Sequence, residues 1–402
     1  MSRCALAVLL LAACGGSTAG DAGAPDGLPG ETRPGKRSQN AFAADPASGR
    51  LLIFGGDTGP IVDQIPQPVF VDDTWVLDPA AGWHPVAGDR PSARARAASA
   101  LDPAGRVLVF GGRWRATGTS GDYTLDRDLW AFDLATESWS LVDDGSSGPS
   151  GREIPVAAFD ATDGALYVYG GDTDPSALGI APSAEVWRFQ AGAWSPMAPG
   201  GDAPVPRHFM ASTFDGNRRR LIIFGGQPGN FVDPGMSDLY ALDLGTMTWS
   251  QLHPGGAGAP PGRFSATLAY DAEGDRYLLF GGHADPGVTN DLWAFDPDAG
   301  TWSELAAGDV FTGRPLGCLG NPAEIPDDYV TQDLAAPERR ASATVGLLDG
   351  ALLVFGGQSD CSDHLDDTWR YSLSSPGWSE LLPARSGESC ARRNDDCACL
   401  CL

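Results

Sequence analysis

The chain contains one sequence pattern six times. Each copy has an apolar run that ends in Gly-Gly, then a variable stretch, then an acidic residue two positions before an aromatic one, and a Trp seven to nine residues after that aromatic. The glycine pairs are Gly55 and Gly56, Gly111 and Gly112, Gly170 and Gly171, Gly225 and Gly226, Gly281 and Gly282, and Gly356 and Gly357. A repeat of this length indicates one supersecondary unit that is built six times, so it constrains the whole architecture.

Other positions recur in the same order within each copy. Five copies carry an Arg seventeen or eighteen residues before the first Gly, and Arg339 or Arg340 stands in that place in the sixth. The five are Arg37, Arg94, Arg152, Arg207 and Arg263. Eleven of the twelve Trp residues occupy repeat positions, and only Trp114 lies elsewhere. The repeat therefore explains the Trp content, which does not indicate a cofactor site.

Each copy has room for four short strands. One follows the Arg, one is the Gly-Gly run, one surrounds the acidic-X-aromatic triplet, and one begins at the closing Trp. Turn-forming stretches such as DPAAG and DPDAG separate the third strand from the fourth, as expected for a hairpin. Four antiparallel strands repeated radially predict an all-β fold, a six-bladed β-propeller with four antiparallel strands per blade.

With these residues the chain resembles the kelch-repeat family, which includes the galactose-oxidase-like propellers. The resemblance covers residues 37–382 and implies that the first strand lines a central channel and that Gly-Gly bends the chain where blades crowd together. Glycine suits that place because it tolerates positive φ and close backbone approach. Every copy has its own first strand, so no strand exchange between the termini is needed. The spacing of the glycine pairs predicts an insertion at about 308–336.

The two ends predict where the protein resides. Residues 1–13 read as a signal peptide whose Leu-Ala-Ala precedes Cys14, a pattern typical of bacterial lipoproteins. We expect Cys14 to be lipidated, with residues 14–36 as the lipidated Cys and a flexible tether. Gly15 points to the outer membrane, on its periplasmic side or at the surface. The expected membrane contact is through the lipid alone, since the apolar stretch is too short for a permanent span.

Charge and cysteine content suit an envelope protein. A net charge of −25 disfavours nucleic acid and anionic lipid headgroups. Six cysteines remain after the signal and the lipid site, and in an oxidising compartment they are disulfide candidates: Cys318, Cys361, Cys390, Cys397, Cys399 and Cys401. Their pairing stays open. The last four lie in a Cys-rich tail, residues 383–402, for which a soft-metal site is the alternative.

Strand parity places the long connections on one edge of the propeller. The loops between second and third strands fall at 57–72, 113–127, 172–184, 227–237, 283–290 and 358–366, and the insertion joins them. Because binding residues concentrate on long loops held by a rigid scaffold, this face is the predicted working face.

The repeated arginines begin the first strands, so we expect them near the channel mouth on the same face. Six guanidinium groups there would suit a carboxylate ligand; the alternative is that each pairs with an acidic residue or a carbonyl of the propeller itself. The candidate ligand-binding residues are Arg37, Arg94, Arg152, Arg207, Arg263, Arg340 and His208.

Signals for catalysis and for metals are weak. The five histidines are His84, His208, His253, His283 and His364, and their spacing does not define a metal site. The acidic stretch 359–367 could hold calcium, although solvated loop charge explains it equally well. No catalytic residue, metal or cofactor is therefore assigned, and we expect a protein that is not an enzyme.

Three functions remain. The favoured one is an envelope-anchored, monomeric interaction protein that recognises a protein or glycan through the long-loop face, which exposed Phe70, Trp114 and Phe231 would support. The alternative is a sugar-acid isomerase resembling the six-bladed sialic-acid mutarotases, which converging Arg and Glu at a concave mouth would support. The third is a purely structural surface protein.

Overall fold

The computed structural model describes residues 32–384 apart from 63–64, 79–80, 178, 230–233, 286, 312–329, 332–334 and 360–363. Several predictions fall on residues outside this part of the chain. They concern the signal peptide, Cys14 and most of the tether, nearly all of the tail, Phe231, and the six disulfide candidates Cys318, Cys361, Cys390, Cys397, Cys399 and Cys401.

The described chain forms six sheets of four antiparallel strands, with additional short strands on some of them. Blade 1 consists of β1 (Ala41–Asp45), β2 (Arg50–Phe54), β5 (Thr74–Asp78) and β6 (Gly82–Val86). Blade 2 consists of β7 (Ala98–Leu101), β8 (Arg106–Phe110), β11 (Leu129–Asp133) and β12 (Ser138–Asp143). Blade 3 consists of β13 (Val156–Asp160), β14 (Ala165–Tyr169), β15 (Val186–Gln190) and β16 (Ala193–Met197).

The other three blades repeat this order. Blade 4 consists of β18 (Ala211–Asp215), β19 (Arg220–Phe224), β20 (Leu239–Asp243) and β21 (Thr248–His253). Blade 5 consists of β23 (Thr267–Asp271), β24 (Arg276–Ala284), β25 (Val288–Asp296) and β26 (Thr301–Ala306). Blade 6 consists of β29 (Thr344–Leu348), β30 (Ala351–Phe355), β31 (Thr368–Ser372) and β32 (Gly377–Leu382). The predicted six-bladed propeller is confirmed.

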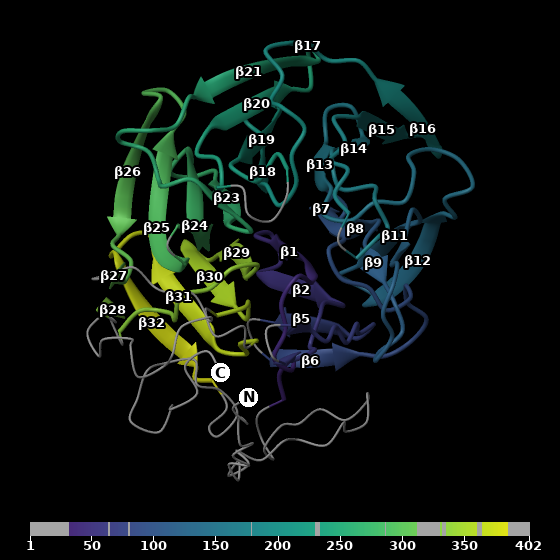
Figure 1. Cartoon of the computed structure of the whole chain (residues 1–402), viewed down its shortest axis with the longest axis horizontal. Coiled ribbons are helices and arrows are strands. Elements are labelled where there is room, and N and C mark those ends of the chain that lie inside the picture. The colour runs from purple at the N-terminus through teal and green to yellow at the C-terminus, as the bar shows by residue number, and fades with distance from the viewer. Residues whose placement is uncertain are drawn as a thin grey trace, which may run out of the picture.

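The blades form a closed ring around their first strands (Figure 1). Each first strand contacts the first strands of both neighbours, and β1 meets β29 where the last blade returns to the first. Every blade takes its four strands from one continuous stretch of the chain, so the ring closes without strand exchange. In the described part of the chain, no helix is long and apolar enough to cross a bilayer.

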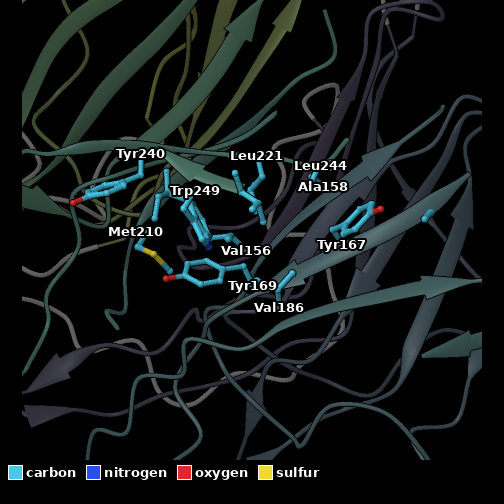
Figure 2. Close-up of a cluster of buried hydrophobic side chains, with 13 residues drawn as sticks. Val156, Ala158, Tyr167, Tyr169, Val186, Met210, Leu221, Tyr240, Leu244 and Trp249 are labelled. Carbon is cyan, nitrogen blue, oxygen red and sulfur yellow. The ribbon is translucent and has the colours of Figure 1, made fainter. Parts of the chain in front are cut away.

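Aromatic pairs join each blade to the next. The closing Trp of one blade packs against the aromatic residue that directly precedes the Gly-Gly pair of the preceding blade, with ring centroids 4.9 to 5.4 Å apart. The pairs are Phe54–Trp139, Phe110–Trp194, Tyr169–Trp249, Phe224–Trp302, Phe280–Trp378 and Phe355–Trp83. Figure 2 shows the pair between blades 3 and 4 inside its cluster of buried apolar side chains. The last pair closes the ring, so the repeated Trp is an inter-blade packing residue.

The glycine pairs stand where neighbouring blades meet. All twelve glycines have positive φ, between 60° and 109°. A Cβ on Gly225 would lie 2.5 Å from the carbonyl oxygen of Arg263 in the next blade, a distance that no side chain tolerates. The backbone N–H of Gly226 donates to that same oxygen at 2.9 Å. Glycine is therefore required both for its conformation and for the close approach.

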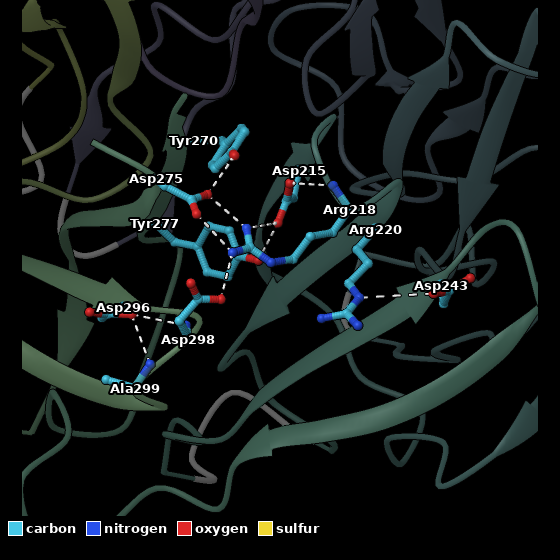
Figure 3. Close-up of polar contacts among 10 residues, drawn as sticks. All are labelled: Asp215, Arg218, Arg220, Asp243, Tyr270, Asp275, Tyr277, Asp296, Asp298 and Ala299. Atoms are coloured by element: carbon cyan, nitrogen blue, oxygen red, sulfur yellow. Dashed lines mark hydrogen bonds and ion pairs between the residues drawn. The ribbon is translucent and has the colours of Figure 1, made fainter. Parts of the chain in front are cut away.

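The turn face, opposite the long loops, is tied together by ion pairs. Figure 3 shows Arg218 of blade 4 reaching Asp275 and Asp298 of blade 5. Its Nη1 and Nη2 each lie 2.7 Å from an oxygen of Asp275, and Nη2 lies 2.8 Å from Asp298. The hydrogen bonds from Arg218 and Tyr270 lower the pKa of Asp275 to about 2. This face is thus occupied by contacts between blades.

The opposite edge, called here the loop face, carries the connections between second and third strands. Three of the extra strand pairs extend from long connections: β3 (Ile61–Val62) with β4 (Ile65–Pro66), β9 (Arg113–Trp114) with β10 (Thr124–Leu125), and β27 (Val310–Phe311) with β28 (Val330–Thr331). The last pair lies in the predicted insertion. β17 (Gly200–Gly201) runs beside β21, and β22 (Arg263–Phe264) pairs with β24.

Candidate functional site

The six repeated arginines point into their own blades. Arg263, which is 0% exposed, donates from Nη1 and Nη2 to the two carboxylate oxygens of Asp291 at 2.6 and 2.8 Å, and from Nη1 to the Gly281 carbonyl at 3.0 Å. Four others bind both oxygens of their carboxylate in the same way, and Arg152 binds one oxygen: Arg37 with Asp73, Arg94 with Asp128, Arg152 with Glu185, Arg207 with Asp238, and Arg340 with Asp367. Arg340 therefore occupies the repeat position of blade 6, while Arg339 lies 3.2 Å from Asp309.

The acidic-X-aromatic triplet is the other half of this arrangement. The indole N–H of Trp293 donates to Asp291 at 2.7 Å, so this carboxylate binds both the arginine and its own Trp. Burial disfavours the charged form, yet the hydrogen bonds and charge of Arg263 lower the pKa of Asp291 below its ordinary value. These contacts account for the repeated arginines through the blade itself and favour the structural alternative; a ligand role for any of them, or for His208, stays a prediction.

A different set of residues forms the channel mouth. These residues stand two positions after each repeated arginine and have left-handed backbone conformations, with φ between 47° and 62°: Gln39, Arg96, Ile154, Phe209, Ser265 and Ser342. Backbone hydrogen bonds join these residues around the mouth, from the N–H of one to the carbonyl of the equivalent residue in the preceding blade, as from Ile154 to Arg96 at 2.7 Å. Such conformations are costly for residues other than glycine, and strain of this kind gathers at functional sites.

Arg96 extends across this mouth. Its Nε donates to Gln39 of blade 1 at 2.8 Å, its Nη1 donates to Glu153 of blade 3 at 3.1 Å, and its guanidinium carbon lies 4.7 Å from the ring centroid of Phe209 in blade 4. A single side chain of blade 2 thus contacts three other blades.

Arg113 shares the carboxylate that Arg96 binds. Its Nε lies 3.1 Å from Oε2 of Glu153, the same oxygen that accepts from Arg96. Burial, together with the nearby charge of Arg96, lowers the pKa of Arg113 to about 10. Two guanidinium groups therefore contact one carboxylate at the mouth, and Asp57 is a further acidic group near Arg113.

Three long loops meet beside the mouth. The guanidinium carbons of Arg113 and Arg115 lie 4.1 and 4.4 Å from the ring centroid of Tyr123, and Phe70 contacts that ring edge-on at 6.1 Å. Phe70 belongs to the loop of blade 1 and the others to that of blade 2, and the N–H of Tyr123 donates to the Pro175 carbonyl in the loop of blade 3 at 2.7 Å. Trp114, between the two arginines in sequence, is 39% exposed. We name Phe70, Arg113, Trp114, Arg115 and Tyr123 the loop-face patch.

Sequence reasoning identified only part of this patch. Trp114 and Phe70 were expected to be exposed; Trp114 is, whereas Phe70 is buried beneath Tyr123 and Arg113. The roles of Arg96, Arg113 and Tyr123 were missed. The available signal was that Arg96 stands two residues after a repeated arginine, at a position where residue type changes from blade to blade.

The histidines are dispersed. His208 is buried 3.8 Å from Asp172, and burial lowers its pKa. His84 lies 3.0 Å from Glu137, His283 stacks on Phe264 at 4.7 Å, and His364 lies 3.0 Å from the Gly59 carbonyl. Within the described ranges no three His, Cys, Asp or Glu residues cluster as metal ligands. The acidic stretch weighed for calcium lies partly outside those ranges.

Comparison with protein families matches most of the chain. Residues 28–177 and 156–317 match the family model described as the KLHDC2/KLHL20/DRC7 Kelch-repeats domain, and residues 339–381 match the Kelch motif. The two matches together extend across all six blades.

Curated relatives show the same similarity at low identity. Kelch domain-containing protein 10 of Rattus norvegicus is 26% identical over 284 residues, which is 68% of this chain and 62% of that protein. The leucine-zipper-like transcriptional regulator 1 homolog of Drosophila melanogaster is 24% identical over 354 residues, or 85% of this chain and 31% of that protein. Putative adagio-like protein 2 of Oryza sativa subsp. japonica is 30% identical over 215 residues, which is 51% of this chain and 29% of that protein. The chain thus spans less than two thirds of the length of these relatives.

Proposed function

We propose, since this chain belongs to the kelch-repeat family, that it is an interaction protein and that it binds a protein partner through the loop-face patch. The kelch propeller fold is consistent with a protein-interaction role. The observation that carries the proposal is the convergence of loops from three blades on Tyr123, with two arginines against its ring.

The composition of the patch supports a protein partner. Tyr, Trp and Arg are the residues that dominate binding energy at protein interfaces, where they act as rigid anchors surrounded by weaker contacts. Here Phe70 and Arg113 support Tyr123 from below and beside it, while Trp114 is exposed. The ring and both guanidinium groups are therefore ordered before binding, which reduces the entropy lost on association.

The isomerase alternative has less support. This alternative predicts that Arg and Glu side chains converge at the channel mouth, and Arg96, Arg113 and Glu153 do converge there. However, Glu153 is 7% exposed and both of its oxygens contact guanidinium groups, an arrangement that positions the arginines and leaves no oxygen turned to the open face. A glycan remains the other possible ligand for the same patch.

To test the proposal, the whole chain is used as bait for an envelope-protein fraction and, in parallel, is applied to a glycan array. The double variant Arg115→Ala/Tyr123→Ala removes two anchors, and Leu141→Ala, which alters an exposed residue of β12, is the matched control. We expect a protein that wild type and control retain and that the double variant binds at least about 30-fold more weakly, as for loss of a hot spot. A glycan ligand, or a protein retained equally by all three forms, contradicts the proposal.

We also propose that lipidated Cys14 holds the propeller at the bacterial outer membrane. Support comes from the Leu-Ala-Ala-Cys sequence after the apolar stretch. Stable anchoring by acyl chains requires the modified residue, so Cys14→Ser should move the protein from the membrane fraction to the soluble fraction. Unchanged partition of that variant would contradict the proposal.

A further inference from the structure

The propeller encloses a central channel of about 590 Å³. Its walls are the six first strands, and it extends from the mouth residues on the loop face, such as Arg96 and Phe209, to turn-face residues such as Pro46 and Asn217. Small-molecule sites in proteins commonly have volumes of roughly 300–1,000 Å³. The channel is therefore large enough for a small ligand.

The chemistry of the walls is uneven. Ala, Ser and Thr make up 18 of the 38 described lining residues, and larger apolar residues lie toward the turn face, where Phe159, Phe214, Tyr270 and Leu347 line the wall. Arg96 is the one charged residue among the described residues that line the channel, although the protein as a whole carries 52 acidic and 27 basic residues. The channel is thus uncharged along its length and cationic at one end.

Arg96 keeps hydrogen-bonding capacity at that end of the channel. Arg96 and Arg113 contact the same oxygen of Glu153, and Asp57 is a further acidic group near Arg113. Among the described residues, the hydrogen bonds of Arg96 to Gln39 and Glu153 use Nε and Nη1, which leaves the N–H groups of Nη2 for a ligand. A ligand carboxylate at this point would accept charge-assisted hydrogen bonds from Nη2 of Arg96.

We propose that the central channel binds an amphipathic monocarboxylate, whose aliphatic chain lies along the uncharged walls and whose carboxylate meets Arg96. This site is separate from the loop-face patch, because a ligand within the channel uses the first strands and not the long loops. Burial of the aliphatic chain favours binding, and Arg96 fixes which end of the ligand faces the mouth.

The test uses sodium decanoate as the probe and isothermal titration calorimetry on the whole chain, with decyltrimethylammonium as the cation of equal chain length. We expect decanoate to bind one to one and the cation not to bind. Ser212→Phe places a phenyl group in the channel wall and should abolish binding, whereas Ser140→Phe, the same change on exposed β12, should bind as wild type does.

Arg96→Gln should weaken decanoate binding by about tenfold or more, the loss expected for a charge-assisted hydrogen bond, and Arg96→Lys should keep most of it. Melting curves identify any variant that fails to fold, and Ala157→Phe, also in the wall, then replaces Ser212→Phe. The proposal is overturned if decanoate does not bind, if the filled channel binds it as well as wild type, or if the cation binds equally well.

Discussion

Two sets of arginines differ in every property that bears on function. The six repeated arginines are 0% to 2% exposed, and each is bound to a carboxylate of its own blade. Arg96, Arg113 and Arg115 occur once each, contact residues of other blades or stack on Tyr123, and lie at the channel mouth or on the loop face. The arginines that recur in all six blades stabilise the structure of each blade, and the arginines that occur in one blade alone are available to bind a ligand or partner.

The physical reason is that each blade meets the same problem. Its second strand must turn sharply at Gly-Gly, which exposes a carbonyl to the interior, and the repeated arginine binds this carbonyl while its carboxylate partner binds the arginine. A buried polar group must have a partner. The solution is therefore the same six times, whereas a ligand approaching from one side does not impose sixfold repetition.

The largest effect that tests this contrast is expected for Arg263→Ala. The change leaves the carboxylate of Asp291 buried without its cation, and removing one member of a buried ion pair costs about 3–5 kcal/mol. Urea unfolding should show this loss, with decanoate affinity per folded molecule unchanged.

The double variant Arg263→Ala/Asp291→Ala is the control. It removes both charges, so it should lose less than the sum of the two single variants. If Arg263→Ala folds with wild-type stability, the repeated arginines are not structural, and a ligand role for them regains support.

A second comparison concerns two tryptophans. Trp249 is 4% exposed and packs against Tyr169 of the preceding blade at 4.9 Å, whereas Trp114 is 39% exposed on the loop face. We expect Trp249→Phe to lose about 1–3 kcal/mol through the cavity and the weakened aromatic pair. The matched Trp114→Phe should change stability by less than about 0.5 kcal/mol. Thermal melts of both variants measure this difference, and equal losses would remove the contrast.

Sequence reasoning could predict the fold because the repeat carries it. Glycine pairs, triplets and closing tryptophans are recognisable from residue type alone, and each has one structural role in every blade. The placement of the repeated arginines near the start of the first strands also followed from strand parity. The direction of their side chains did not, because it depends on a carbonyl exposed later in the chain, which for Arg263 is that of Gly281, eighteen residues on.

The loop-face patch was mostly beyond sequence reasoning for a different reason. Phe70, Tyr123 and Pro175 belong to three loops, and the lengths and turns of those loops determine which side chains meet. The mouth residues were missed because their shared property is a backbone conformation, positive φ, that Gln, Arg, Ile, Phe and Ser all adopt here. Such a conformation has no residue signature unless glycine occupies it.

The point where the two regions meet provides a pH prediction. Asp126 follows the β9–β10 hairpin, and its Oδ2 lies 3.5 Å from Nε of Arg94 in the repeated module. Burial raises its pKa from 3.8 to about 6, although Arg94 opposes the shift. The folded protein therefore binds this proton more tightly than the unfolded chain does, so the contribution of Asp126 to stability falls as pH rises from about 4 to about 6.

Asp126→Asn removes the cost of burying an ionised carboxylate at this position. At pH 7 we expect the variant to be more stable than wild type by about 1–2 kcal/mol, since each pH unit between the two pKa values corresponds to about 1.4 kcal/mol and Asn loses the attraction to Arg94. Below about pH 3 the difference should vanish, because the wild-type carboxyl is then neutral in both states. Unfolding curves between about pH 3 and pH 8 measure this trend. A variant that is less stable at pH 7 would show that the ion pair with Arg94 outweighs burial.

A small change in stability is also expected for Arg115→Ala, and a small change lets its effect on binding be measured separately from folding. The guanidinium of Arg115 lies 4.4 Å from the Tyr123 centroid and donates from Nη1 to the Gly121 carbonyl at 3.1 Å. A cation–π contact near the surface contributes about 0.5–1 kcal/mol, so the variant should stay within about 1 kcal/mol of wild type. The affinity of Arg115→Ala for the partner should nevertheless fall. The affinity of Arg115→Lys should fall less, since lysine keeps the charge without the planar stack.

If Arg115→Ala loses as much stability as Arg263→Ala, the division between structural and recognition arginines is wrong. If it is stable and keeps full affinity for the partner, the division holds but the binding surface lies elsewhere on the loop face.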